Sequence, residues 1–351
     1  MPCFSSVPFS PLPFRERADY HFSMPDAIKS VLAFFAIVCG LCEGFAAGPF
    51  TIAVIPKGTT HEFWKSINAG AIKAQQELTE QGTKVDIIWK GPLREDDRVQ
   101  QIQVVENFTS RHVSAIVLAP LDSQALVTPV EKAVAAGVPV VVMDSDLKSD
   151  KYVSFVATDN YKGGQLAGEH LAKLLGGKGN VILLRYAVGS ASTEAREAGF
   201  LDSIKKFPDI KLISSDQHAG ATRELAYRAS QSLLNRFRQD VNGVFCPNET
   251  VTIAMTKALR DIGLADGKVK QVGFDAGSQS VADMKNGDLQ ALVVQNPILM
   301  GYLAVKTAVQ HLRGEKVERR IDTGVALVTK DNMESTEMKE LLHPPLDKYL
   351  K

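Results

Sequence analysis

From residue 49 onward, the chain alternates short, almost uninterrupted apolar runs with longer segments of helical period. A first series reads TIAVIP, KVDIIW, SAIVLAP, VPVVVMD and YVSFVATD, and a second reads NVILLRY, IKLISS, GVFCPN, VKQVGFD and LQALVVQ. Apolar runs of this length without polar alternation are typical of strands that are buried on both faces, as in parallel sheets covered by helices. The chain therefore predicts an α/β fold.

The connecting segments have the pattern of helices. Apolar or small residues recur at helical spacing from Phe63 to Leu78. Thr59 and Glu62 fit a capping box before this helix, and Gly82 fits a stop after it. Further helices are predicted at 125–136 and 161–175, the second closed by a pair of glycines.

The two series are alike in length and order, and 351 residues suit about two domains. We predict two similar doubly wound, Rossmann-like parallel-sheet lobes joined by a strand hinge, near 157–159 and again near 295. The N-terminal lobe would comprise 50–157 and 296–322, and the C-terminal lobe 158–295 and 323–351. Residues 1–47 would form a separate leader.

The leader has the layout of a secretory signal peptide. Lys29 provides a basic start, Ser30–Leu41 an apolar run that is short for a membrane span, and Ala46 and Ala47 small residues for cleavage. Met24 is a candidate for the true start. An uncleaved anchor is the alternative. The prediction is export to the periplasm.

Ligands of doubly wound sheets bind beyond the carboxyl ends of the strands, so polar residues that end strands are candidates for a site. A single such residue is more often a helix cap or a turn former. In this chain they come from both halves: Lys57, Asp144, Asp159, Asn248, Asp275 and Gln295. Phe63 and Trp64 open the first helix and would offer aromatic faces, although core packing explains Phe63 equally well.

Several stretches together resemble the ribose-binding class of periplasmic sugar-binding proteins, the substrate-binding proteins of ABC transporters. They are HEFWKSINAGA, VPVVVMDSD, VATDNYKGGQLAGEHLA, STEAREAGF, VFCPNE, VGFDAG and LVVQNP, and the resemblance covers nearly all of the chain from Phe50. It implies a venus-flytrap fold, the type I periplasmic binding fold. It also implies reversible binding of a sugar between the lobes and delivery to a membrane permease.

The resemblance also assigns roles to residues. Phe63 and Trp64 would stack on a sugar ring, and Arg196 would donate a guanidinium fork. Side chains at strand ends would bind hydroxyls: Asp144, Asn248, Asp275 and Gln295. Structural alternatives stay open for three of them. Arg196 would be a surface residue paired with Glu194 or Glu197, Asp275 a cap of the following helix, and Asn248 part of a turn with Glu249.

Two departures from the ribose-binding pattern concern the ligand. Ser145 stands where ribose binders have an arginine, and the segment HAGATRE lacks their aromatic residue, while Lys57 adds a cation at the first strand end. We therefore expect a bulkier or substituted monosaccharide, a polyol or a signalling furanose, and not ribose itself. Asp283, on the helix after Asp275, is expected to lie outside the site.

Other function classes fit less well. A transcription regulator with this core would begin with a basic DNA-binding domain, and the apolar leader occupies that place. The formal net charge is zero, so nucleic acid is not expected as a partner. An enzyme on a similar scaffold, with Asp144 and Asp275 as an acid–base pair, is the remaining alternative. We expect no enzymatic activity, no cofactor, no metal and a monomer. A chemoreceptor is left open as a second partner.

Overall fold

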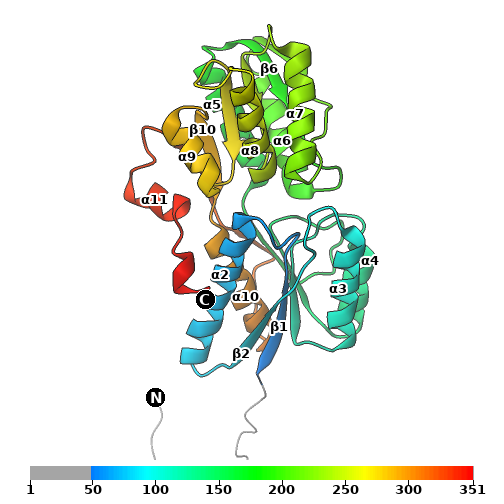
Figure 1. Cartoon of the computed structure of the whole chain (residues 1–351). Helices are drawn as coiled ribbons and strands as arrows, with labels where there is room; N and C mark the ends of the chain where they lie inside the picture. Colours follow the sequence, from blue (N-terminus) through cyan, green and yellow to red (C-terminus); the bar gives the residue numbers. More distant parts are fainter. Residues whose placement is uncertain (1–48, 351) are drawn as a thin grey trace, which may run out of the picture. The chain divides into compact units, whose positions relative to one another are not determined.

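The computed structural model describes residues 49–350, and the predicted leader at 1–47 lies outside the described residues. Two six-stranded sheets form the framework, in the orders β11-β5-β4-β3-β1-β2 and β12-β10-β9-β8-β6-β7 (Figure 1). Every pairing is parallel except that of β12 with β10. The predicted α/β fold with two doubly wound lobes is confirmed.

The first lobe contains the first sheet and the helices that cover it. Helices α2 and α10 cover one face, and α3 and α4 cover the other. Its elements are β1 (Phe50–Ile55), α2 (Glu62–Glu80), β2 (Val85–Trp89), α3 (Arg98–Ser110), β3 (Ala115–Leu118), α4 (Val127–Ala135), β4 (Val140–Met143), β5 (Ser154–Ala157), α10 (Pro297–Leu312) and β11 (Arg320–Asp322).

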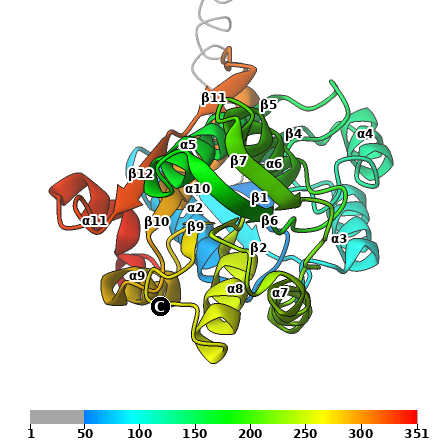
Figure 2. The same ribbon diagram turned by 90° about the horizontal axis from the view of Figure 1, so that it is seen from above.

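The second lobe repeats this plan. Figure 2 shows α5 and α6 on one side of β6 and β7, with α7 and α8 on the other. Its elements are α5 (Asn160–Leu174), β6 (Lys178–Leu183), α6 (Ala191–Ile204), β7 (Asp209–Ser214), α7 (Arg223–Phe237), β8 (Gly243–Phe245), α8 (Glu249–Asp261), β9 (Lys270–Phe274), α9 (Ser278–Asn286), β10 (Ala291–Gln295), β12 (Val325–Thr329) and α11 (Thr336–Leu342), followed by a short 3₁₀ turn, η1 (Leu346–Lys348).

The uninterrupted apolar runs are explained by burial on both faces of each sheet. In β1, Ile52 and Val54 pack against α2 and α10, whereas Ala53 and Ile55 pack against α3 and α4. Because successive side chains of a strand point to opposite faces, a strand with helices on both sides has no position for an exposed polar residue. No helix within residues 49–350 is long and apolar enough to cross a membrane.

Each lobe has one pair of helices in backbone contact through glycine. A Cβ atom on Gly70 of α2 would lie 2.0 Å from the carbonyl oxygen of Ile298 in α10. In the second lobe, a Cβ atom on Gly164 of α5 would lie 1.9 Å from the carbonyl oxygen of Arg196 in α6. Any larger residue would separate these helices. The second contact fixes the position of α6 relative to α5, and so of Arg196.

The predicted start of α2 is wrong. Its N-cap residue is His61 and not Thr59, and no side chain caps it. Thr59 instead donates a hydrogen bond to the carbonyl oxygen of Pro92 in the loop after β2. A tertiary contact outweighs the local capping pattern here. The predicted end is confirmed, since Gly82 follows the helix with a φ of 85°.

Candidate functional site

The carboxyl ends of strands from both sheets surround one cavity of about 30 Å³, which we call the cleft cavity. Most of the residues that line this cavity are buried. Access for a ligand therefore depends on how far apart the two lobes lie. Eight of the nine residues singled out from the sequence line this cavity: Lys57, Phe63, Trp64, Asp144, Arg196, Asn248, Asp275 and Gln295.

Of the polar residues that end strands, Asp159 is the one that does not line the cleft cavity. Its side chain accepts a hydrogen bond from the backbone N–H of Lys162 and caps α5. For this residue the ordinary role of a strand-end aspartate, as a helix cap, is the correct one.

Asp144 and Asp275 occupy corresponding places in the two lobes, directly after β4 and after β9. Their φ angles are 62° and 71°, in the left-handed region that residues other than glycine rarely adopt. Such a conformation costs free energy and persists only where the surrounding contacts fix it, and it is frequent at binding sites. The backbone thus departs from strand geometry at both aspartates that face the cavity.

Lys57 forms a buried ion pair with Asp144, and the Nζ–Oδ2 distance is 3.0 Å. The same ammonium lies 3.0 Å from the hydroxyl of Ser192 in the second lobe. Ser145 meets the second lobe as well, since its hydroxyl accepts a hydrogen bond from the backbone N–H of Ser192. The cation beside Asp144 therefore comes from the residue after the end of β1 and not from position 145.

Arg196 is buried, with 2% of its surface exposed. Its Nε donates to Asn160 at 2.8 Å and its Nη1 donates to the carbonyl oxygen of Pro247 at 2.9 Å. The guanidinium lies 3.9 Å from the ring centre of Phe274, and its Nη1 lies 3.9 Å from a carboxylate oxygen of Asp275. Burial lowers the pKa of Arg196, and the charge of Asp275 opposes the change.

The surface alternative for Arg196 is wrong. Glu197, one of its proposed partners, pairs with Arg185 at 2.8 Å. Glu194 accepts a hydrogen bond from the backbone N–H of Gly189 instead. Arg196 therefore faces the cavity and not the solvent.

Asp275 does not cap the helix that follows it. The N-cap of α9 is Gly277, and no side chain caps it. Asp275 accepts hydrogen bonds from Gln295 Nε2 at 2.7 Å and from the backbone N–H of Glu249 at 3.1 Å. Burial raises the pKa of Asp275, while the positive charge of Arg196 lowers it.

Asn248 has a structural role besides its place at the cavity. Its Oδ1 accepts a hydrogen bond from the backbone N–H of Val251 at 3.1 Å and caps α8. The cap uses one lone pair of the amide oxygen, and the amide nitrogen is the donor that Asn248 can offer to a molecule in the cavity.

Trp64 is 3% exposed and packs edge-on against Phe63, with ring centres 5.0 Å apart. Sequence reasoning missed a further aromatic residue, Tyr186, which lines the cavity from beyond the end of β6. Tyr186 ends the apolar run NVILLRY, so the strand-end rule would have found it if it had been applied to aromatic side chains. It provides an aromatic group from the second lobe, where the HAGATRE segment has none.

Glu95 was also missed, because it lies in the loop between β2 and α3 and no motif marks it. Its carboxylate accepts three hydrogen bonds, from His61 Nδ1 and Trp64 Nε1 at 2.6 Å and from the hydroxyl of Tyr186 at 2.7 Å. Burial opposes ionisation, yet the hydrogen bond and charge of His61 lower the pKa of Glu95 to about 2. Glu95 thus organises one wall of the cavity as a carboxylate.

Hydrogen bonds also join the lobes at the rim of the cavity. Glu62, in the first turn of α2, accepts from the backbone N–H and the hydroxyl of Ser278, both at 2.7 Å. Ser278 is the first residue of α9, so a carboxylate of one lobe lies at a helix N-terminus of the other. This geometry is electrostatically favourable.

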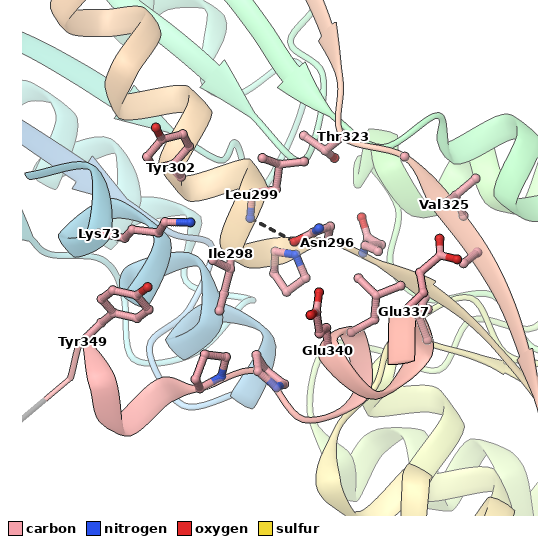
Figure 3. Close-up of a pocket in the computed structure, with 18 residues that line it drawn as sticks. Lys73, Asn296, Ile298, Leu299, Tyr302, Thr323, Val325, Glu337, Glu340 and Tyr349 are labelled. Carbon is pink, nitrogen blue, oxygen red and sulfur yellow. Dashed lines mark hydrogen bonds between the residues drawn. The ribbon is translucent and has the colours of Figure 1, made fainter. Parts of the chain in front are cut away.

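A larger cavity of about 630 Å³ lies where the chain passes between the sheets. Figure 3 shows Asn296 and Thr323 on two of the passing segments, with Glu340 of α11 and Tyr349 on the C-terminal side. Gln295 borders both this cavity and the cleft cavity. A change in the angle between the lobes would therefore alter both spaces.

Comparisons with known proteins match these features. The model of the periplasmic binding protein domain matches residues 52–316. A ribose import binding protein of Bacillus subtilis is 31% identical over 282 residues, which cover 80% of this chain and 88% of the relative. The solved structure of a carbohydrate transporter solute binding protein from Agrobacterium radiobacter, in complex with D-arabinose, has a TM-score of 0.79 and 34% identity and covers 84% of this chain and 99% of its own.

A second solved structure matches this chain over a similar length and with a similar identity. It is an ABC transporter solute binding protein from Agrobacterium vitis with bound D-fucose, with a TM-score of 0.78 and 35% identity. The match covers 84% of this chain and all of the other. The similarity therefore includes both lobes.

The role of Glu95 predicts a pH-dependent loss of stability in Glu95→Gln. The folded-state pKa is depressed, so the stabilisation from ionised Glu95 is complete above its ordinary pKa and is lost as the pH falls toward about 2. We expect the variant to be less stable by about 2 kcal/mol at pH 7, and the difference to shrink below about pH 4.5. Denaturant unfolding at pH 7, 5 and 3 measures it.

The exposed Glu106 of α3 provides the matched control, Glu106→Gln, which should change little at any of these pH values. A Glu95→Gln protein as stable as the wild type at pH 7 would contradict the role given to the carboxylate.

Proposed function

Because this chain belongs to the periplasmic binding protein domain family, we propose that it is the exported substrate-binding protein of an ABC-type importer. It binds a monosaccharide or a similar polyol reversibly between its two lobes and delivers it to a membrane permease. The observation that supports this most directly is the convergence of acidic, basic, amide and aromatic side chains from both lobes on one cavity. Hydroxyl groups bind to the first three kinds of side chain, and the faces of a sugar ring bind to the fourth.

The lobes would act as domains that separate at the passing segments. Residues 50–157 with 296–322 would move against 158–295 with 323–351. In support, β5 and β11 belong to the first sheet, whereas β10 and β12 belong to the second. Since the cleft cavity is small when the lobes touch, opening would admit the ligand and closure would enclose it.

An enzymatic role has less support. Asp144 is paired with Lys57, and Asp275 accepts a hydrogen bond from Gln295, so both carboxylates already have partners within the cavity. The proposed protein returns its ligand unchanged. It would act as a monomer. Recognition of the closed form by a chemoreceptor is compatible with this proposal.

The proposed site predicts that Asp275→Ala and Arg196→Ala each weaken sugar binding by at least roughly tenfold. Each truncation leaves a buried polar partner without its contact. Calorimetric titration against D-ribose, D-arabinose, D-fucose, D-glucose and D-galactose measures the affinity, with mass spectrometry of the recovered sugar and a melting curve for each variant.

Asp283 does not line the cleft cavity, as expected from the sequence, but it is unsuitable as the control for this experiment. It is buried and pairs with Arg260 at 2.7 Å, so its loss would cost stability. Asp216→Ala, at an exposed loop position, is the better control. Normal affinity in both Asp275→Ala and Arg196→Ala would refute the site, and a chemically altered sugar would refute the transport role.

Closure predicts a separate effect for Glu62→Gln. Glu62 is at the rim, where its carboxylate contacts Ser278 across the cavity without lining it. Loss of the charge should destabilise the closed form and leave contacts inside the cavity intact. We expect a severalfold faster release of bound sugar in stopped-flow measurements, with the association rate nearly unchanged. A release rate equal to that of the wild type would show that the rim contact does not hold the lobes together.

Export predicts a processed N-terminus. If residues 24–47 are a signal peptide, the protein isolated from the native cell envelope should begin near Gly48. N-terminal sequencing measures this directly. Recovery of the full-length chain from the cytosol would overturn the location and leave the binding proposal untouched.

A further inference from the structure

The cleft cavity contains a hydrogen-bond acceptor without a donor. Gln295 is 3% exposed, and its Oε1 has no hydrogen-bond partner among residues 49–350. The orientation of the amide is fixed, because Nε2 donates to a carboxylate oxygen of Asp275 at 2.7 Å. Turning the amide over would bring two acceptor oxygens together at that distance. The group that Gln295 leaves available is therefore an acceptor.

Glu249 is a second acceptor at the same cavity, and it is poorly satisfied. It is 3% exposed, and its oxygens lie 3.4 Å from the backbone N–H of Phe63 and 3.4 Å from a guanidinium nitrogen of Arg223. Both distances exceed the usual 2.9–3.0 Å by about 0.4 Å. Burial raises the pKa of Glu249, which is the direction expected for a carboxylate that lacks strong partners.

Of the carboxylates that line the cavity, Glu249 is the one without a cation of its own in the lining. Three of the four lining carboxylates have a lining cation beside them: Asp144 has Lys57 at 3.0 Å, Glu95 has His61 at 2.6 Å, and Asp275 has Arg196 at 3.9 Å. Glu249 has Arg223 at 3.4 Å, whose side chain is 52% exposed and whose charge is therefore screened by solvent, and it shares the charge of His61 with Glu95. Among the residues that line the cavity, four carboxylates thus face three cations when His61 is protonated.

We propose that the ligand of the cleft cavity is a sugar with a basic amino group, and that Glu249 is the residue that selects it. This inference rests on the proposed function and specifies its substrate class. An ammonium group brings three donors and one positive charge to a cavity that has unsatisfied acceptors and a surplus carboxylate. A uronic acid or a sugar phosphate would instead place a second negative charge in a space that excludes water.

The test compares sugars that differ at one carbon, where an amino group replaces a hydroxyl or a carboxylate replaces the primary alcohol. D-glucose, D-galactose and D-allose are titrated at pH 7 beside their 2-amino-2-deoxy, 6-amino-6-deoxy and uronic acid forms. For the neutral sugar that binds most tightly, we expect its better amino form to bind about tenfold more tightly and its uronic acid about tenfold more weakly. Equal binding of the uronic acid, or weaker binding of both amino forms, overturns the inference.

Glu249→Gln tests the residue. This variant keeps the shape and one acceptor but removes the charge. The preference for the amino sugar over its neutral parent should fall about tenfold. Glu106→Gln is the matched control on an exposed helix face. A retained preference, or an equal loss for both sugars, would show that Glu249 does not select the ligand.

A second variant covers the case in which Glu249→Gln does not fold. Arg223 is largely exposed and supplies the partial counter-charge of Glu249. Arg223→Gln should therefore increase the preference for the amino sugar severalfold, and a decrease would overturn the inference. Failure of every sugar to bind would instead refute the proposed function. Binding of neutral sugars without a charge preference refutes the inference alone.

Discussion

A charge that is removed from water needs a partner in the same place, and this requirement organises the protein. Acidic and basic side chains from both lobes meet in the cleft cavity, where hardly any solvent reaches them. Lys57 reaches Asp144, and His61 reaches Glu95. Without such pairs, each buried charge would destabilise the contact between the lobes. Both pairs lie in the first lobe, and a member of each also contacts the second lobe: Lys57 contacts Ser192, and Glu95 accepts a hydrogen bond from Tyr186.

Sheet topology places these charges within reach of one another. In a parallel sheet all strands end at the same edge, so residues far apart in sequence come together there. Asp144 follows β4 and Asp275 follows β9, and both leave the strand with a positive φ. The helix pairs around Gly70 and Gly164 are in backbone contact, which leaves little freedom for the elements that carry Trp64 and Arg196. The framework is rigid where the site requires precision.

The contacts between the lobes are polar, and this suits reversible closure. Glu62 with Ser278, Tyr186 with Glu95, and Lys57 with Ser192 are all pairs that water can replace when the lobes part. A large apolar interface would hold the lobes together without a ligand. A polar one allows the free energy of binding to decide the balance between open and closed forms.

The sequence by itself determined the fold class, because uninterrupted apolar runs tolerate only strands buried on both faces. It also determined most of the positions that line the cleft cavity, since strand ends must converge in a doubly wound fold. It failed at Thr59, whose local capping pattern lost to a contact with Pro92. Only the tertiary structure identified Glu95 and Glu249 as residues of the cleft cavity, because each matters through the residues that lie across the cavity from it. No sequence period or motif encodes this proximity, because it depends on how the two lobes meet.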